Sequence, residues 1–211
     1  MSIIKFIILH VALTLLFADA STTFEPVIED FSNPKHSWDV LNDTLMGGQS
    51  SGTLSITNGV ADFKGSVSTV SFLHGPGFVS IVTHGGVYPD MSTCNALKLN
   101  LMVTQEYSGL RISLGSVNIK GKRHSIGYRS KIDAPVGSFT DIIIPFADFT
   151  VKSVKDEDRT VITCKENDEY CLSEGILGSI KTLSIWGEGV EGNFHLRIKS
   201  ISATNCSDNT N

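Results

Sequence analysis

The residues that could carry catalytic chemistry are scattered in this 211-residue chain. The G-x-S-x-G nucleophile elbow, the H-E-x-x-H zinc motif and the phosphate-binding loop do not occur in it. A Ser-His-Asp arrangement could arise only through folding, because no histidine has a catalytic partner close to it in sequence. We expect the side chain of His195, on the polar face of an alternating segment, to be solvated. The sequence therefore predicts a non-enzymatic protein that needs no cofactor.

Metal and phosphate binding have candidate residues but no matching motif. Four aspartates could supply oxygen ligands for calcium, yet their spacing fits no calcium loop. The glycine-rich stretches 46–48 and 84–86 could cradle a phosphate, but neither opens an evident helix. We interpret them as turns that need positive φ, and we expect no bound metal. The aspartates are Asp30, Asp43, Asp62 and Asp148.

The chain contains four cysteines, an even number that favours two disulfides in an oxidising compartment. Three pairings are possible. Cys164 and Cys171 flank a short polar loop, so a bridge between them is easy to close, and Cys94 would then pair with Cys206. The alternative is a zinc site, but there is no C-x-x-C and no histidine at ligand spacing from a cysteine.

The N-terminal segment has the features of a secretory signal peptide. Lys5 precedes an apolar stretch at residues 6–17, and Ala18-Asp19-Ala20 fits the cleavage rule for small residues. We expect residues 1–20 to be a signal peptide and residues 21–211 a single domain without a transmembrane segment. The alternatives are a retained anchor, for which the apolar stretch is short, or a mitochondrial presequence, which would be rich in arginine.

The charge of the chain argues against nucleic-acid binding. It carries 17 basic and 22 acidic residues, for a net charge of −5, and no long basic run. Two N-glycosylation motifs begin at Asn42 and Asn205, and both matter only in a secreted chain.

The elements that must position these residues are mostly strands. Alternating apolar and polar residues predict strands at 54–56, 61–63, 97–103, 110–114 and 194–201, and shorter apolar runs predict others at 79–82, 142–144 and 183–186. Asn58-Gly59 between two alternating runs predicts a tight hairpin. Residues 173–180 could form one or two helical turns, and residues 152–168 a surface loop. Many short strands with glycine-rich turns favour a β-sandwich or jelly roll.

One stretch resembles the signature of the complex I intermediate-associated protein 30 family. It is W-D-V-L-N-D-T-L-M-G-G-Q-S-S-G at residues 38–52, which contains a tryptophan, an N-D pair and M-G-G-x-S. Further motifs of that family follow in order: A-D-F-K-G at 61–65, G-F-V-S-I at 77–81, P-F-A-D-F at 145–149, and a closing strand at 192–201. The resemblance covers residues 29–203.

The resemblance implies an all-β fold, a galactose-binding-like jelly-roll β-sandwich. It also implies a chaperone-like assembly factor without catalytic residues, since mitochondrial members assemble respiratory complex I. The signal peptide and the cysteines favour the secretory pathway over mitochondria for this chain. We expect a protein client as the partner. A secreted carbohydrate-binding module that binds a glycan is the alternative, suggested by the fold class alone.

The signature has a structural and a functional interpretation. Structurally, Trp38 would fill the end of the sandwich, residues 46–48 would make a tight turn, and Asp43 would cap backbone N–H groups. Functionally, the loop would form a binding site at the rim of the jelly roll. The residues of this candidate site are Trp38, Asn42, Asp43, Met46, Gly47 and Gly48.

Overall fold

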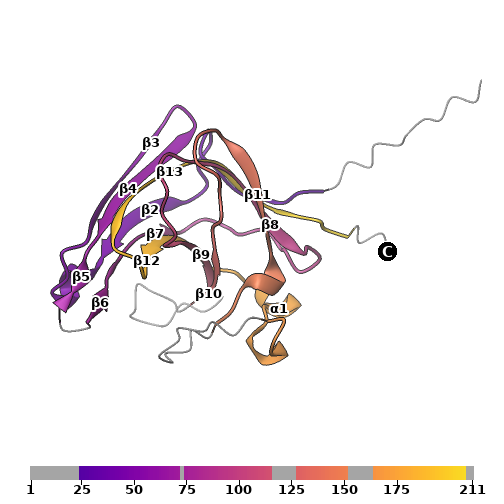
Figure 1. Ribbon diagram of the computed structural model, residues 1–211. Coiled ribbons are helices and arrows are strands. Elements are labelled where there is room, and N and C mark those ends of the chain that lie inside the picture. Colours follow the sequence, from indigo (N-terminus) through magenta and orange to yellow (C-terminus); the bar gives the residue numbers. More distant parts are fainter. Residues whose placement is uncertain (1–23, 72–73, 116–126, 152–163, 208–211) are drawn as a thin grey trace, which may run out of the picture.

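Two antiparallel β-sheets packed face to face make up the protein (Figure 1). The computed structural model describes residues 24–71, 74–115, 127–151 and 164–207. Sheet A contains, in spatial order, β11 (Thr140–Pro145), β8 (Ala96–Val103), β13 (Gly192–Thr204), β4 (Val60–Val67) and β3 (Ser51–Thr57), and β1 (Val27–Asp30) also pairs with β13. Sheet B contains β10 (Tyr128–Lys131), β9 (Leu110–Gly115), β12 (Thr182–Glu188), β7 (Phe78–His84) and β2 (Ser37–Asn42). The predicted all-β jelly-roll sandwich is confirmed.

The remaining elements are short. A two-stranded ribbon pairs β5 (Thr69–Val70) with β6 (Gly75–Pro76). The helical turns are η1 (Asp43–Met46), η3 (Phe146–Asp148), η4 (Asp168–Tyr170) and α1 (Glu174–Leu177). The single turn of α1 lies within the predicted 173–180 segment. Of the predicted loop at 152–168, residues 152–163 lie outside the described residues.

The hairpin of β3 and β4 forms at the predicted turn. Asn58 and Gly59 have φ values of 50° and 76°, and Thr57 lies opposite Val60. Positive φ at both central residues matches the right-handed twist of the strands, and asparagine and glycine tolerate it best. This hairpin places Ile56 on the free edge of β3, where its side chain is 36% exposed.

The apolar positions of the alternating strands meet between the sheets. Leu97, Leu99 and Leu101 of β8 are fully buried, as are Ile112 and Leu114 of β9. In β13 the register shifts between Ile198 and Ser200, so a bulge moves the buried positions from even to odd numbers. This explains why the alternation of the last strand changes at Ser200-Ile201.

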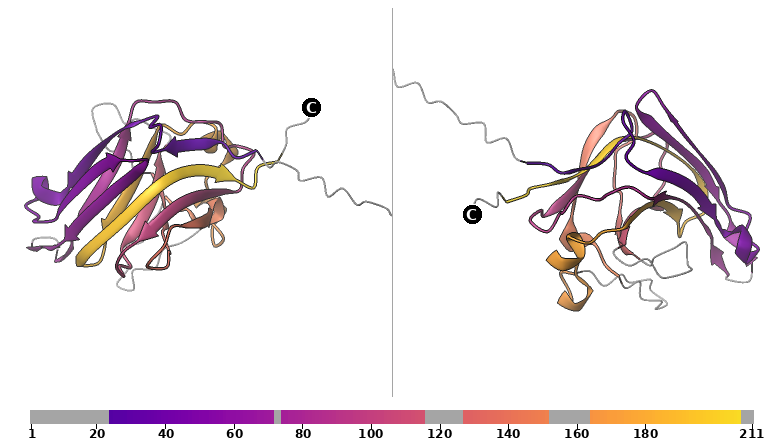
Figure 2. Two further views of the ribbon diagram at one scale, coloured as in Figure 1. Left: turned by 90° about the horizontal axis from the view of Figure 1, so that it is seen from above. Right: turned by 180° about the vertical axis from the view of Figure 1, so that it is seen from behind.

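Both predicted cysteine pairs are at disulfide-bonding distance. Cys94–Cys206 joins the segment before β8 to the end of β13, and Cys164–Cys171 closes a short loop around η4. Figure 2 shows β1 alongside the end of β13 at one end of the sandwich. Cys206, in the first of these bridges, follows shortly after β13. The expected signal peptide at residues 1–20 lies outside the described residues, and it stays a prediction.

Within the described ranges, no helix combines the length and the apolar character needed to cross a membrane.

Candidate functional site

The signature loop is organised around one buried carboxylate. Asp43 is fully buried, and its side chain accepts hydrogen bonds from Ser50 N (3.1 Å), Ser50 Oγ (2.6 Å) and Phe78 N (3.1 Å). A Cβ on Gly77 or Gly48 would lie 1.5 Å or 2.2 Å from atoms of that carboxylate, so only glycine fits at both positions. The carboxylate thus holds the loop after β2 against the start of β7.

The outside of the same loop is apolar. Asn42 caps η1, accepting from Thr44 N at 3.2 Å, and Gly47 ends it with a φ of 73°. Between these caps Leu45 is 97% exposed and Met46 is 40% exposed. The motif therefore presents two apolar side chains on a turn that is fixed from within.

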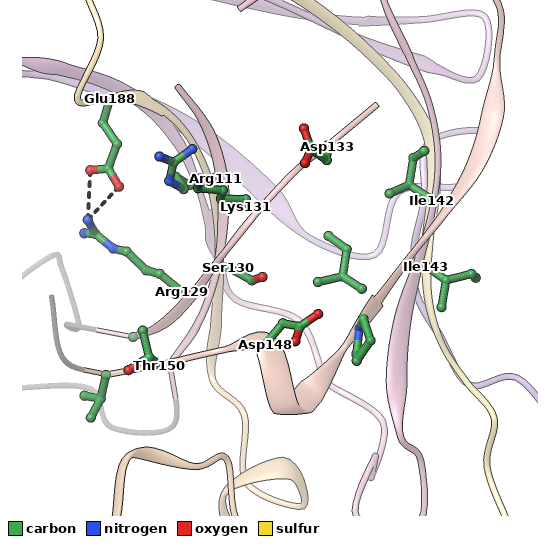
Figure 3. Close-up of a pocket in the computed structure, with 14 residues that line it drawn as sticks. Arg111, Arg129, Ser130, Lys131, Asp133, Ile142, Ile143, Asp148, Thr150 and Glu188 are labelled. Atoms are coloured by element: carbon green, nitrogen blue, oxygen red, sulfur yellow. Dashed lines mark hydrogen bonds and ion pairs between the residues drawn. The ribbon is translucent and has the colours of Figure 1, made fainter. Parts of the chain in front are cut away.

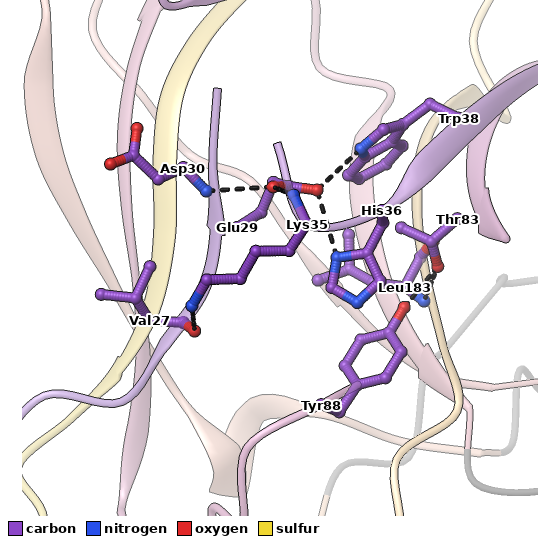
Figure 4. Close-up of polar contacts among 9 residues, drawn as sticks. All are labelled: Val27, Glu29, Asp30, Lys35, His36, Trp38, Thr83, Tyr88 and Leu183. Atoms are coloured by element: carbon purple, nitrogen blue, oxygen red, sulfur yellow. Dashed lines mark hydrogen bonds and ion pairs between the residues drawn. The ribbon is translucent and has the colours of Figure 1, made fainter. Parts of the chain in front are cut away.

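Trp38 lies in a different polar network, at the junction of β1 and β2 (Figure 4). Glu29 is fully buried, and its carboxylate accepts hydrogen bonds from Trp38 Nε1 (3.0 Å) and Lys35 N (2.8 Å) and contacts His36 Nδ1 (3.1 Å). The structure thus brings Asn42, Asp43, Met46, Gly47 and Gly48 together and leaves Trp38 with Glu29. Whether any of them binds a ligand stays a prediction.

Tyr88 extends the Glu29 network across sheet B. Its ring lies 4.5 Å from that of His36, and its hydroxyl contacts Thr83 Oγ1, which in turn donates to Leu183 O at 3.1 Å. Burial raises the pKa of Tyr88 to about 12, because the phenolate would lose its hydration.

Alkaline pH should therefore destabilise the protein through Tyr88. With a pKa raised from 10.0 to about 12 by folding, the phenol stays protonated in the folded state while the unfolded chain ionises. The stabilisation is complete below pH 10 and is lost as the pH rises through 12, by about 2 kcal/mol at pH 12. Urea unfolding between pH 9 and pH 12 should show a shallower decline for Tyr88→Phe than for the unmodified protein. Parallel declines would contradict the assignment.

A groove of about 770 Å³ opens on the other side of the molecule, between the edge strands β10 and β11 (Figure 3). Ile142 and Ile144 line it from β11, and Ile144 is 5% exposed. Charged side chains of both signs surround these isoleucines. They are Arg111, Arg129, Lys131, Asp133, Asp148 and Glu188.

Some of these charges are engaged with one another. Arg129 Nη1 bonds both carboxylate oxygens of Glu188 (3.0 and 2.8 Å), and the guanidinium lies 4.3 Å from the ring centroid of Trp186. Lys165 pairs with Asp148 at 2.6 Å.

Three charges of the groove have no ion-pair partner among the described residues: Arg111, Lys131 and Asp133. Among the described residues, Arg111 donates to the backbone carbonyls of Ser108 and Leu110. Within the described part of the chain, the groove thus has two unpaired cations, Arg111 and Lys131, and one unpaired carboxylate, Asp133.

The described residues include histidine–carboxylate pairs but no candidate metal cluster. No group of three or more histidines, cysteines or acidic residues that could hold a metal ion occurs among them. The side chain of His195 is 24% exposed and contacts both carboxylate oxygens of Asp62 at 3.1 Å, so the expectation of a solvated histidine was wrong. Burial raises the pKa of Asp62, but hydrogen bonds from His195 and Lys64 outweigh it and lower the pKa below its usual value.

Sequence reasoning did not identify the groove. Arg111 lies on β9 and Arg129 on the neighbouring strand β10, and Glu188 comes from β12. The alternation at 110–114 does place Arg111 on the face opposite the core, but nothing in the sequence joins it to β10. The four residues of β10, Y-R-S-K, contain no apolar alternation.

Comparisons with known proteins place the chain as follows. A profile of the family described as complex I intermediate-associated protein 30 matches residues 29–160. No curated protein matches the chain in sequence. The family 11 carbohydrate-binding module of the cellulosomal cellulase Lic26A-Cel5E of Clostridium thermocellum superimposes with a TM-score of 0.56 at 15% identity, covering 90% of this chain and 99% of that one. The Clostridium thermocellum module in complex with a β-1,3-1,4-mixed-linked tetrasaccharide gives a TM-score of 0.55 at 15% identity, covering 89% and 99%. These two likenesses concern the fold.

Proposed function

The chain belongs to the complex I intermediate-associated protein 30 family, and we propose on this basis that it is a non-enzymatic, chaperone-like protein that binds a client polypeptide. The observation that carries the proposal is the groove between β10 and β11. Its isoleucine lining can bury apolar side chains of a client, and its rim offers both signs of charge to polar ones. Members of the family act in the assembly of respiratory complex I. The proposal for this chain is that it binds a client polypeptide, which need not belong to that complex.

The signature loop is the proposed second contact with the client. Leu45 and Met46 are exposed on a turn that the Asp43 carboxylate fixes from within, so the backbone of the turn would lose little conformational freedom on binding. Exposed apolar side chains on a rigid turn are suited to contact another protein surface. Of the candidate site predicted from the sequence, Met46 would contact the client, and Asn42 and Asp43 would hold the turn in place.

The proposed compartment is the secretory pathway. Two disulfides favour an oxidising environment, because cytosolic thiols are kept reduced. The predicted signal peptide and the glycosylation motifs at Asn42 and Asn205 point the same way. Mitochondria remain the alternative that the family suggests.

Site-specific photo-crosslinking tests the client-binding function. A benzoylphenylalanine at position 131, exposed beside the groove, should crosslink to a chemically denatured model protein. The same group at position 64 is the matched control, because Lys64 is an exposed lysine on β4 of sheet A and does not line the groove. Equal yields at the two positions would contradict a client site in the groove.

A glycan is the second candidate ligand, and one observation favours it. On the face of sheet B turned away from the core, Trp186 lies opposite Ser80, whose hydroxyl is buried and has no hydrogen-bond partner among the described residues. A buried hydroxyl in a folded protein usually has a hydrogen-bond partner, which can be a protein group, a water or a ligand. Trp186, Arg129 and Glu188 together resemble the aromatic and charged groups that bind sugar rings and hydroxyls.

A glycan array separates the two candidates. Specific binding of a β-glucan that Arg129→Ala abolishes, without a change in thermal unfolding, would establish the glycan and argue against the client. An array without signal, together with the crosslink at position 131, supports the client.

A further inference from the structure

We infer, resting on the client-binding function proposed above, that the client enters the groove as an extended segment that adds a strand to the free edge of β11. Sheet edges offer unpaired backbone groups that another chain can extend. β11 is an end strand of sheet A, and its only strand partner among the described residues is β8.

The hydrogen-bond pattern shows which backbone groups of β11 face outward. Directly after the strand, Phe146 N donates to Asn95 O at 2.9 Å, toward β8. In an antiparallel pair the residues that bond the neighbour alternate, so Ile142 and Ile144 also bond β8. The N–H and C=O groups of Asp141 and Ile143 then point away from the sheet, and no hydrogen bond of theirs to another described backbone group occurs.

These outward groups have the spacing that a strand requires. Asp141 and Ile143 are two residues apart, and two residues are the repeat of a β-strand, roughly 6.6 Å. A peptide backbone presents its own donors and acceptors with the same repeat. A sugar chain does not present alternating donors and acceptors in this way, so the edge favours a polypeptide.

The protein itself shows that extended chain adds to the edge strand on the opposite wall. Thr150 pairs with Arg129 of β10 through two backbone hydrogen bonds, 2.8 Å from Arg129 N to Thr150 O and 3.0 Å in the reverse direction. Among the described residues this addition comprises one residue pair. β11, the edge strand on the other side of the groove from β10, offers a longer free edge that runs along the groove.

Side chains around the edge indicate the composition of the added strand. Ile142 and Ile143, both among the lining residues, point to opposite sides of β11, with Ile142 on the side of Asp133 (Figure 3). Ile144 also lines the groove and is two residues from Ile142, so it shares that side of the strand. Alternate residues of the client would therefore be apolar and would face the isoleucines. The positions between them would lie on the side of Ile143, so polar residues such as glutamate suit them. Among the described residues, the unpaired Arg111 and Lys131 outnumber Asp133 in the groove lining, so charge complementarity favours a client segment that is acidic overall.

Edge strands that avoid pairing often carry exposed charges, proline or a bulge. β11 carries one charged residue, Asp141, whose carboxylate accepts a hydrogen bond from Asn100 Nδ2 at 2.6 Å. β11 has no register shift and carries Ile143, 47% exposed, in its middle. Proline occurs only at its last position, Pro145, where it removes one outward donor and leaves those of Asp141 and Ile143. No described strand other than β8 pairs with β11, so the described residues leave the first part of this edge open.

Binding of a labelled peptide of alternating valine and glutamate tests the inference. Ile143→Pro removes the outward N–H of residue 143 and leaves the hydrogen bonds between β11 and β8 in place. It should weaken peptide binding by about tenfold, as expected for the loss of one backbone hydrogen bond. Ile56→Pro is the matched control. The backbone N–H of Ile56 also points outward from its strand, β3, which is the other edge of sheet A. This control should bind the peptide as the unmodified protein does.

Two N-methylated versions of the peptide complete the test. Methyl groups on the valine nitrogens block one edge of the peptide strand, and methyl groups on the glutamate nitrogens block the other. Strand addition predicts that only one version loses affinity. Equal affinity for both versions, an unchanged affinity of Ile143→Pro, or no peptide binding at all would overturn the inference. The crosslink of the denatured client at position 131 would still decide separately whether the groove binds clients.

Discussion

Replacing Asp43 with alanine should lower the free energy of unfolding by about 4 kcal/mol or more. The substitution leaves the N–H and the hydroxyl of Ser50 and the N–H of Phe78 without their acceptor. Each buried donor without a partner costs about 1–3 kcal/mol. A single domain is typically stable by only about 5–15 kcal/mol, so the variant should unfold at a much lower urea concentration or fail to fold.

An exposed aspartate on the adjoining strand provides the control for Asp43. The side chain of Asp39 on β2 is 54% exposed and contacts only His84 among the described residues. Asp39→Ala should change the free energy of unfolding by less than about 1 kcal/mol, as surface pairs usually do. If Asp43→Ala were as mild as Asp39→Ala, the carboxylate would not be the support of the loop, and a role in direct ligand binding would gain ground.

Removing the long-range disulfide should have the second large effect. Cys94 and Cys206 are 112 residues apart, and closing a loop of that length stabilises a folded chain by about 5 kcal/mol in the loop-entropy account. The double serine variant at these positions should therefore lose more stability than any exposed side-chain change. Urea unfolding followed by circular dichroism measures the loss.

The short disulfide is the internal comparison. Cys164 and Cys171 are only 7 residues apart, so their double serine variant should lose about 2.5 kcal/mol. Equal losses for the two variants would mean that strain or local packing, and not loop closure, determines what the bridges contribute.

The sandwich could be predicted because its central strands alternate. In β8, and in β13 up to its bulge, every second residue is apolar and buried. The Asn58-Gly59 turn fixes one hairpin without help from distant residues. β2 and β10 were not predicted, because their half-buried sequences carry little alternation. Such strands form because neighbouring strands offer them hydrogen bonds, which is tertiary information.

The candidate site was harder to predict, for the same physical reason. The signature marks residues 38–52 as important, but the partners of Asp43 include Phe78, which is 35 residues away. The groove depends on the meeting of Arg129 with Glu188, which are 59 residues apart. Local patterns indicate which face of a strand is polar, but they do not show which polar faces adjoin.

Crosslinking from position 131 is the most direct test of the central claim, that the groove between β10 and β11 receives a client polypeptide. Mass spectrometry of the crosslinked product would identify the client segment that lies beside Lys131. The account predicts crosslinks at position 131 that greatly exceed those at position 64, with client segments in which apolar residues alternate with acidic ones. Crosslinks of equal yield at the two positions would contradict it.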